Sequence, residues 1–126
     1  MINFIFKPKD VYLDKYPTDY PYVLDYEGEF IIEVDGKIFF SEPDFSIFEF
    51  LMYIKKWIND VDSNNDMLYN SIDTEDNPLI SFIYSNDRWN IHSKWQLFNC
   101  YTSFSKEELV SAIVLLEKKL TTYSRS

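Results

Sequence analysis

A repeat of two between apolar and polar positions marks two amino-terminal stretches as strands. The first covers residues 2–7 and ends at Pro8, and the second runs through residues 22–37. Successive side chains of an extended chain point to opposite faces, so we expect one face of the second strand on the core and the other in water. Gly28 predicts a bulge or bend within it. Residues 9–21 are expected to form a loop or an irregular edge.

The Asp35–Gly36 pair predicts a reversal of the chain between the second strand and a third. A two-residue turn would place Val34 opposite Lys37 and would mismatch the apolar and polar faces of the next pairs. A three-residue loop with Gly36 in the left-handed conformation avoids the mismatch, and we expect this register. Its pairs are Glu33 with Lys37, Ile32 with Ile38, and Phe30 with Phe40.

Two Ser-x-x-acid motifs predict helix starts, because such a pair satisfies free amide groups of the first helical turn. The motif at residues 41–44, with Pro43 inside it, predicts a helix over about residues 44–60. The motif at residues 105–108 predicts a helix over residues 105–123, where apolar residues repeat at helical spacing. The first helix is apolar around most of its circumference. We expect it to be sandwiched within the domain, the alternative being that part of its face is an interface.

Short apolar segments between the two helices predict further strands. They are residues 67–69, 79–85, 89–93 and 95–101, with Asn86–Asp87 as a hairpin turn. The expected fold is a single α+β domain over residues 1–126, with two helices and a mainly antiparallel sheet of about six strands. A length of 126 residues suits one domain, and no repeat or Gly/Ser linker divides the chain.

Acidic residues outnumber basic ones by 21 to 12, so the formal net charge is −9 at pH 7. The excess is uneven, because residues 61–87 contain six acidic and no basic residues, whereas residues 88–126 carry more basic than acidic ones. Such a charge opposes binding to nucleic acid or to an anionic membrane and favours a basic partner. The alternative is that the charge only keeps a small domain soluble.

The acidic residues concentrate on the polar face of the second strand and in the segment after the first helix. Carboxylates two apart on one strand face repel by about 0.6 kcal/mol in bulk water, and a basic partner would relieve this repulsion. The alternative is a solvated strand face and loop with no partner. The candidate partner-binding residues are Asp25, Glu27, Glu29, Glu33, Asp62, Asp66, Asp73, Glu75 and Asp76.

Residue types suited to catalysis or metal binding are few. The single histidine, His92, lies on the polar face of a predicted strand, and the single cysteine, Cys100, is expected to be a buried thiol. Residues 60–66 space their oxygens like the start of a calcium loop, but Asn65 replaces the required Gly and Ser71 the required Glu. We expect no catalytic residue, no metal and no cofactor.

Location is indicated by the amino terminus and by the cysteine content. The first ten residues lack the basic stretch, apolar run and cleavage site of a secretory signal. No apolar run reaches the length of a membrane span, and one cysteine excludes an internal disulfide and suits a reducing compartment. We therefore expect a cytoplasmic protein.

The last third of the chain carries a resemblance. The run Trp89-Asn90-Ile91-His92-Ser93-Lys94-Trp95-Gln96, followed by Ser105-x-Glu107-Glu108-Leu109-x-x-Ala112-Ile113, resembles the close of small acidic immunity proteins from bacterial toxin–immunity systems. The resemblance implies a cytoplasmic protein that binds one cognate toxin domain, often a basic nuclease, and blocks it without doing chemistry. The matching residues are packing and capping residues, so it assigns no contact residue. The alternative expectation is a structural or regulatory module that forms homo-oligomers through the first helix.

Overall fold

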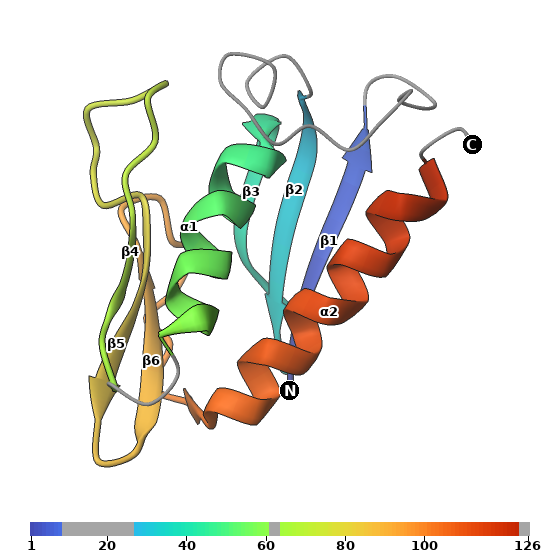
Figure 1. The fold of residues 1–126 in the computed structure, drawn as a ribbon. Coiled ribbons are helices and arrows are strands. Elements are labelled where there is room, and N and C mark those ends of the chain that lie inside the picture. Colours follow the sequence, from blue (N-terminus) through green and yellow to red (C-terminus); the bar gives the residue numbers. More distant parts are fainter. Residues whose placement is uncertain (9–26, 61–63, 124–126) are drawn as a thin grey trace.

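A computed structural model describes residues 1–8, 27–60 and 64–123, and shows two antiparallel sheets with two helices (Figure 1). The first sheet has the order β1-β2-β3, with β1 (Ile2–Pro8), β2 (Glu27–Val34) and β3 (Lys37–Ser46). The second has the order β4-β5-β6-β7, with β4 (Met67–Tyr69), β5 (Ile80–Ser85), β6 (Arg88–Ser93) and β7 (Ser103–Phe104). The helices are α1 (Ile47–Asn59) and α2 (Lys106–Tyr123). The α+β class is confirmed, although the strands form a three-stranded and a four-stranded sheet instead of one sheet.

Helix α1 lies between the two sheets, and α2 packs along β1 (Figure 1). The ring of Phe50 in α1 lies 5.4 Å from that of Phe30 in β2. Further along the helix, Trp57 lies 5.5 Å from Phe82 in β5. Both sides of α1 are therefore covered within the chain, which explains why its apolar residues exceed a single stripe. Within the described residues, neither α1 nor α2 has both the length and the apolar character needed to cross a bilayer.

The β2–β3 hairpin turns through two residues, so the predicted three-residue loop is wrong. Asp35 and Gly36 both have positive φ, at 51° and 80°, and Val34 pairs with Lys37. The mismatch of faces that this turn creates is removed within the strands, because the register shifts between Ile32 and Glu33. As a result Ile32 still pairs with a buried aromatic residue of β3. The observed pairs are Glu33 with Ile38, Ile32 with Phe40, and Phe30 with Glu42.

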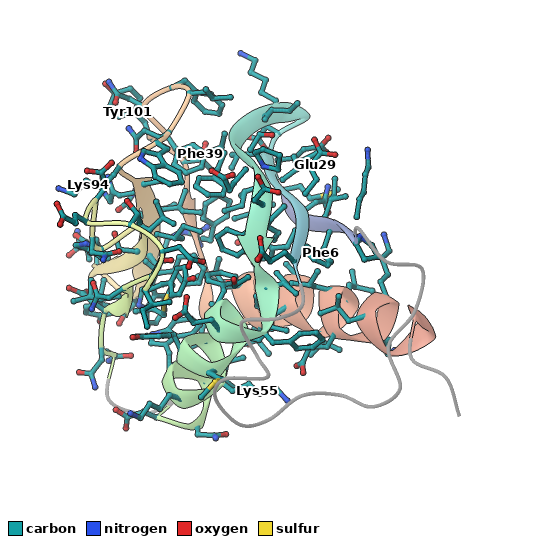
Figure 2. The ribbon with its side chains drawn as sticks, turned by 90° about the horizontal axis from the view of Figure 1, so that it is seen from above. Phe6, Glu29, Phe39, Lys55, Lys94 and Tyr101 are labelled. Atoms are coloured by element: carbon teal, nitrogen blue, oxygen red, sulfur yellow. The ribbon has the colours of Figure 1, made fainter. Side chains whose placement is uncertain are left out.

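The extra residue of this bulge is Phe39, which is fully buried. Its ring lies 5.5 Å from that of Phe98 in an edge-to-face contact, and its carbonyl oxygen accepts a hydrogen bond from the Leu97 amide at 2.8 Å. In Figure 2, Phe39 lies among the packed side chains, whereas Lys94 and Tyr101 lie at the periphery of the molecule. The bulge thus joins the first sheet to the segment that follows β6.

Helix α1 begins at Ile47 and not at residue 44, because the predicted cap belongs to β3. Ser41 pairs with Ile31 and Glu42 pairs with Phe30 across the sheet, so neither is placed to cap a helix. The Glu42 carboxylate accepts a hydrogen bond from the Asp44 amide at 3.1 Å. Pairing with β2 therefore extends the strand through the expected helix start.

Helix α2 begins as predicted, at a reciprocal cap. The Glu108 amide donates to Ser105 Oγ, and the Ser105 amide donates to a Glu108 carboxylate oxygen, both at 3.1 Å. The predicted hairpin turn is also confirmed, since Asn86 and Asp87 have positive φ and Ser85 pairs with Arg88.

The predicted strand over residues 95–101 is wrong, and its place beside β6 is taken by the two-residue β7. Side chains near the end of β6 explain the difference. The Ser93 amide donates to Gln96 Oε1 at 3.0 Å, and the Trp95 amide donates to Ser93 Oγ at 3.1 Å. These local bonds turn the chain away from the sheet, because they occupy main-chain groups that a ladder would use.

The carbonyl oxygen of Asn65 connects α1 to β6. It accepts hydrogen bonds from the indole N–H groups of Trp57, at 2.8 Å, and of Trp89, at 3.0 Å. The two indole rings are 5.7 Å apart and nearly perpendicular, at 84°. Lys106, the first residue of α2, places its ammonium group 4.4 Å from the centre of the Trp57 ring. Three elements and one loop therefore meet at this point.

Candidate acidic binding cleft

A cleft of about 360 Å³ opens where the β2–β3 hairpin meets the segment of residues 70–78, which we call the acidic loop. Four carboxylates line it and define what we call the acidic cleft, namely Glu27, Glu42, Asp44 and Asp73. Its other lining residues are Phe45, Ser46, Ser71, Thr74, Leu79 and Trp95. Among the residues that the structure describes, no lysine or arginine lines this cleft. The cleft therefore combines concentrated negative charge with an apolar wall.

Strand pairing brings three of the four carboxylates together. Glu27 at the start of β2 pairs with Ser46 at the end of β3, two residues after Asp44. Gly28 allows β1 to approach this place closely, because a Cβ there would collide with the Lys7 carbonyl oxygen and the Pro8 Cα. The register shift between Gly28 and Phe30 confirms the predicted bulge. The close packing at Gly28 fixes where the first residue of β2 lies.

The acidic loop contributes Asp73 and is held by its own side chains. The Asn77 side chain accepts a hydrogen bond from the Ser71 amide at 2.9 Å and donates to the Ser71 and Thr74 carbonyl oxygens at 2.9 and 2.8 Å. Asp73 also accepts a hydrogen bond from the hydroxyl of Ser46 at 3.2 Å. These bonds place the Asp73 carboxylate beside the hairpin.

Trp95 forms the aromatic wall, and its orientation is set by hydrogen bonding and stacking. Its indole N–H donates to the Asp76 carboxylate at 2.9 Å, and its ring lies parallel to that of Phe40, with 6.3 Å between centroids. The ring is only partly buried. A flat aromatic face beside carboxylates attracts a cation through its quadrupole as well as through charge.

Three of the four cleft carboxylates have no ion-pair partner among the described residues. In the described part of the chain, no lysine or arginine forms an ion pair with Glu27, Glu42 or Asp73. Glu27 and Glu42 are partly buried, and Asp73 is exposed. Such a site can accept hydrogen bonds from a guanidinium or ammonium group, and its neighbouring negative charges favour that cation further.

The predicted partner-binding residues separate into two groups. Glu27 and Asp73 lie in the acidic cleft, and Glu75 and Asp76 lie on the acidic loop beside it. The cleft thus unites the two acidic regions that the sequence indicated. Glu42 and Asp44 were missed, because their spacing was interpreted as a helix start.

The remaining predicted residues lie elsewhere or have other contacts. Glu29 faces Lys7 across the β1–β2 pair, with 3.9 Å between the charged atoms. Glu33 lies near the other end of β2, and Asp66 accepts a hydrogen bond from the Tyr84 amide at 2.7 Å. Asp25 and Asp62, like the first five residues of the expected second strand, fall outside the described residues. The candidate surface is therefore more local than the whole strand face.

The residues considered for catalysis or metal binding have ordinary surroundings. Cys100 is buried, which raises the pKa of its thiol, and the thiol donates to the Thr102 carbonyl oxygen at 3.5 Å. His92 is exposed on β6 opposite Ser81. Asp60, the first residue of the calcium-like spacing, accepts a hydrogen bond from the Asn65 side chain at 2.7 Å. Among the described residues, no three His, Cys, Asp or Glu side chains gather closely enough to hold a metal ion.

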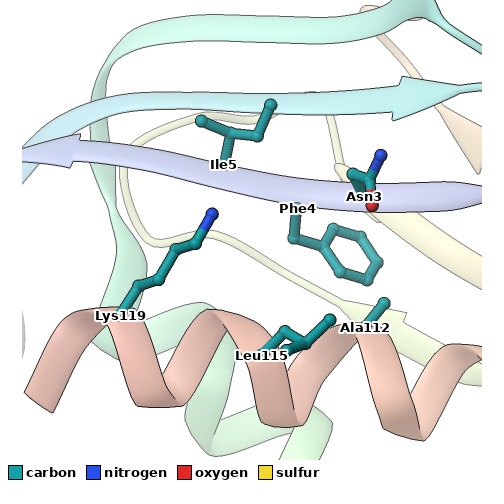
Figure 3. A pocket seen from close by; sticks show the side chains of 6 residues that line it. All are labelled: Asn3, Phe4, Ile5, Ala112, Leu115 and Lys119. Atoms are coloured by element: carbon teal, nitrogen blue, oxygen red, sulfur yellow. The ribbon is translucent and has the colours of Figure 1, made fainter.

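A second hollow, of about 310 Å³, lies between β1 and α2 (Figure 3). Phe4 points from the strand toward the helix, whereas Ile5 points away from it (Figure 3). The described lining of this hollow contains Lys119 and no carboxylate. It therefore does not match the acidic surface that the sequence predicts.

These observations define a small α+β protein with an acidic cleft between the ends of β2 and β3 and the acidic loop. The chain belongs to the DUF7878 family, a domain of unknown function, whose model matches residues 2–124. No curated protein and no solved structure matches the chain.

Proposed function

We propose that this protein is a cytoplasmic, non-enzymatic immunity protein that neutralises a cognate toxin domain by binding a basic surface of that toxin. The observation that carries the proposal is the acidic cleft, where four carboxylates and an aromatic wall meet without a lining cation among the described residues. The net charge of −9 adds a long-range field of the same sign. The resemblance of the last third to immunity proteins agrees with this function.

The cleft suits an arginine or lysine side chain of the toxin. The charged group would meet Glu27, Glu42 and Asp73, while the aliphatic part of the side chain would lie against Trp95. A basic toxin would also be steered toward this side of the molecule, and steering raises the association rate most at low ionic strength. No chemistry by the immunity protein is required, because occupying the toxin surface is sufficient.

The alternative, a module that forms homo-oligomers through the first helix, remains a prediction without a supporting contact. The excess of apolar residues on that helix was the reason to expect homo-oligomers. Because α1 packs between the two sheets, these apolar residues are covered within the chain.

The test uses the gene directly upstream in the source genome. We expect it to encode a toxin domain, and we expect co-expression of this protein to restore growth of cells that produce that domain and to yield a complex with it. The absence of a toxin domain from the upstream product, or of a complex with it, would overturn the proposal.

Charge reversal within the complex tests the site. Glu27→Lys places a cation in the acidic cleft and should lower the association rate about tenfold at low salt. The matched control is Glu107→Lys, which makes the same charge change at an exposed position of α2 away from the cleft. Equal rates for the two variants would show that the toxin binds elsewhere.

A further inference from the structure

Glu49, in the first turn of α1, is only 2% exposed and is the one charged side chain among the buried residues that the structure describes. A buried carboxylate is costly unless hydrogen bonds replace its hydration. An apolar side chain of similar volume would often stabilise such a site equally well. The presence of a carboxylate here therefore calls for an explanation beyond packing.

Two hydrogen bonds reach Glu49 from the chain around the start of the acidic loop. The Tyr69 hydroxyl donates to Glu49 Oε1 at 2.5 Å, and the Ile72 amide donates to Oε2 at 3.4 Å. Tyr69 is the last residue of β4 and is 1% exposed. Burial, together with the hydrogen bond to Glu49, raises the pKa of the Tyr69 hydroxyl, so it remains a donor at neutral pH.

The surroundings of Tyr69 leave its ring little freedom. The rings of Phe45, Phe50 and Tyr53 pack against it in edge-to-face contacts, with centroids 5.8, 5.3 and 5.2 Å away. The hydroxyl position is thus determined by the core, and Glu49 connects it to the Ile72 amide. Glu49 thereby joins the fixed Tyr69 hydroxyl to Ile72, the residue that precedes Asp73.

The start of α1 holds the next residue as well. Ser46, three residues before Glu49, donates its hydroxyl to the Asp73 carboxylate at 3.2 Å. The junction of β3 and α1 therefore contacts the acidic loop twice, through Glu49 at the Ile72 amide and through Ser46 at the Asp73 side chain. Two bonds at successive residues fix both the position and the direction of this part of the loop.

We propose that Glu49 is a positioning residue, which fastens the acidic loop to the core so that Asp73 lies in the acidic cleft. The effect on toxin binding rests on the proposed function, whereas the effect on the loop does not. In this role the buried carboxylate holds a surface loop in place against the rigid helix α1.

Amide hydrogen exchange of Glu49→Gln tests this role without any ligand. The amide of Gln cannot reproduce both acceptor oxygens, so exchange in residues 70–78 should rise at least about tenfold, while protection in β2 and β5 stays unchanged. The control Glu75→Gln removes an exposed carboxylate of the same loop and should leave exchange unchanged. Unchanged exchange in Glu49→Gln, or an equal rise over the whole chain, would overturn the proposal.

A second variant keeps the experiment decisive if Glu49→Gln does not fold. Tyr69→Phe keeps the ring and removes the hydroxyl donor, and it should produce the same local rise in residues 70–78. Protection that stays at the wild-type level in this variant would overturn the role of the Tyr69–Glu49 bond.

Binding to the upstream toxin domain separates this inference from the proposed function. A wild-type protein that does not bind the toxin overturns the proposed function, and the exchange result still decides the role of Glu49. Where the wild type binds, we expect Glu49→Gln to weaken affinity about tenfold, as loss of an ordered contact residue would. An opened loop with unchanged affinity would overturn the link between Glu49 and the cleft.

Discussion

The two helices begin in different ways, although similar four-residue motifs precede them. At α2, Ser105 and Glu108 form a reciprocal cap. At α1, the corresponding residues 41–44 belong to β3, and the structure shows no side-chain cap at Ser46, the residue before the helix. The difference teaches that a capping motif starts a helix only where the chain is not already paired in a sheet. Helix α1 is instead formed by packing between the sheets.

The largest effect should come from removing the packing that forms α1. Phe50 is fully buried and its ring contacts those of Phe4, Phe30, Phe45 and Tyr69. Phe50→Ala should lower the free energy of unfolding by about 3–5 kcal/mol in urea denaturation. The control is Val114→Ala on α2, a residue 43% exposed, which should cost far less. Similar losses for the two would contradict the view that packing dominates at α1.

A smaller effect should distinguish the two serine motifs directly. Ser105→Ala removes one half of the α2 cap and should destabilise the protein by about 1 kcal/mol. Ser41→Ala changes an exposed strand residue and should stay within about 0.5 kcal/mol of the wild type. Thermal or urea unfolding measures both. If Ser41→Ala cost as much as Ser105→Ala, residues 41–44 would have to act as a cap after all.

The smallest effect should be the pH dependence of the α2 cap. The hydrogen bond from the Ser105 amide, with the Arg88 charge adding to it, lowers the pKa of Glu108 below its ordinary value of 4.5. A lowered pKa in the folded state means that the contribution is present above the unfolded pKa and is lost as pH falls through the folded pKa.

The comparison of wild type with Glu108→Gln isolates that contribution, because Gln retains the capping geometry and lacks the charge. Urea midpoints should favour the wild type slightly at pH 7 and should converge in acid, below about pH 4. Glu107→Gln, next in the chain, removes an exposed carboxylate outside the cap and is the control for the loss of one charge. A wild-type advantage that persists in acid would contradict the assignment.

Sequence periodicity predicted the local elements well and their partners less well. The alternation in residues 2–7 and the cap at Ser105 depend on neighbours in the chain, and both were confirmed. The register of the hairpin depended on where an extra residue is accommodated. The turn has only two residues, and the extra residue is Phe39 within β3, where Phe98 packs against it. The strand expected over residues 95–101 failed for a similar reason, since the side chains of Ser93 and Gln96 bond the main chain there.

For the candidate site, too, the sequence indicated some of the residues but not their long-range arrangement. Glu27 and Asp73 were selected from charge patterning alone, and the structure brings both into one cleft. Glu42 and Asp44 were missed because a helix start was assigned to them. The cleft itself depends on the acidic loop reaching the hairpin, a long-range placement set by Ser46 and Glu49 that no local pattern contains.

The shared acceptor at Asn65 gives this protein an internal optical reporter. Trp57 and Trp89 are two of its three tryptophans, with 5.7 Å between their ring centroids and 84° between their ring planes. Indole chromophores this close to each other couple, and the coupling contributes to the circular dichroism spectrum. Because one ring belongs to α1 and the other to β6, this signal exists only while the helix and the second sheet are docked. Assembly of the core can thus be followed spectroscopically without attaching a label.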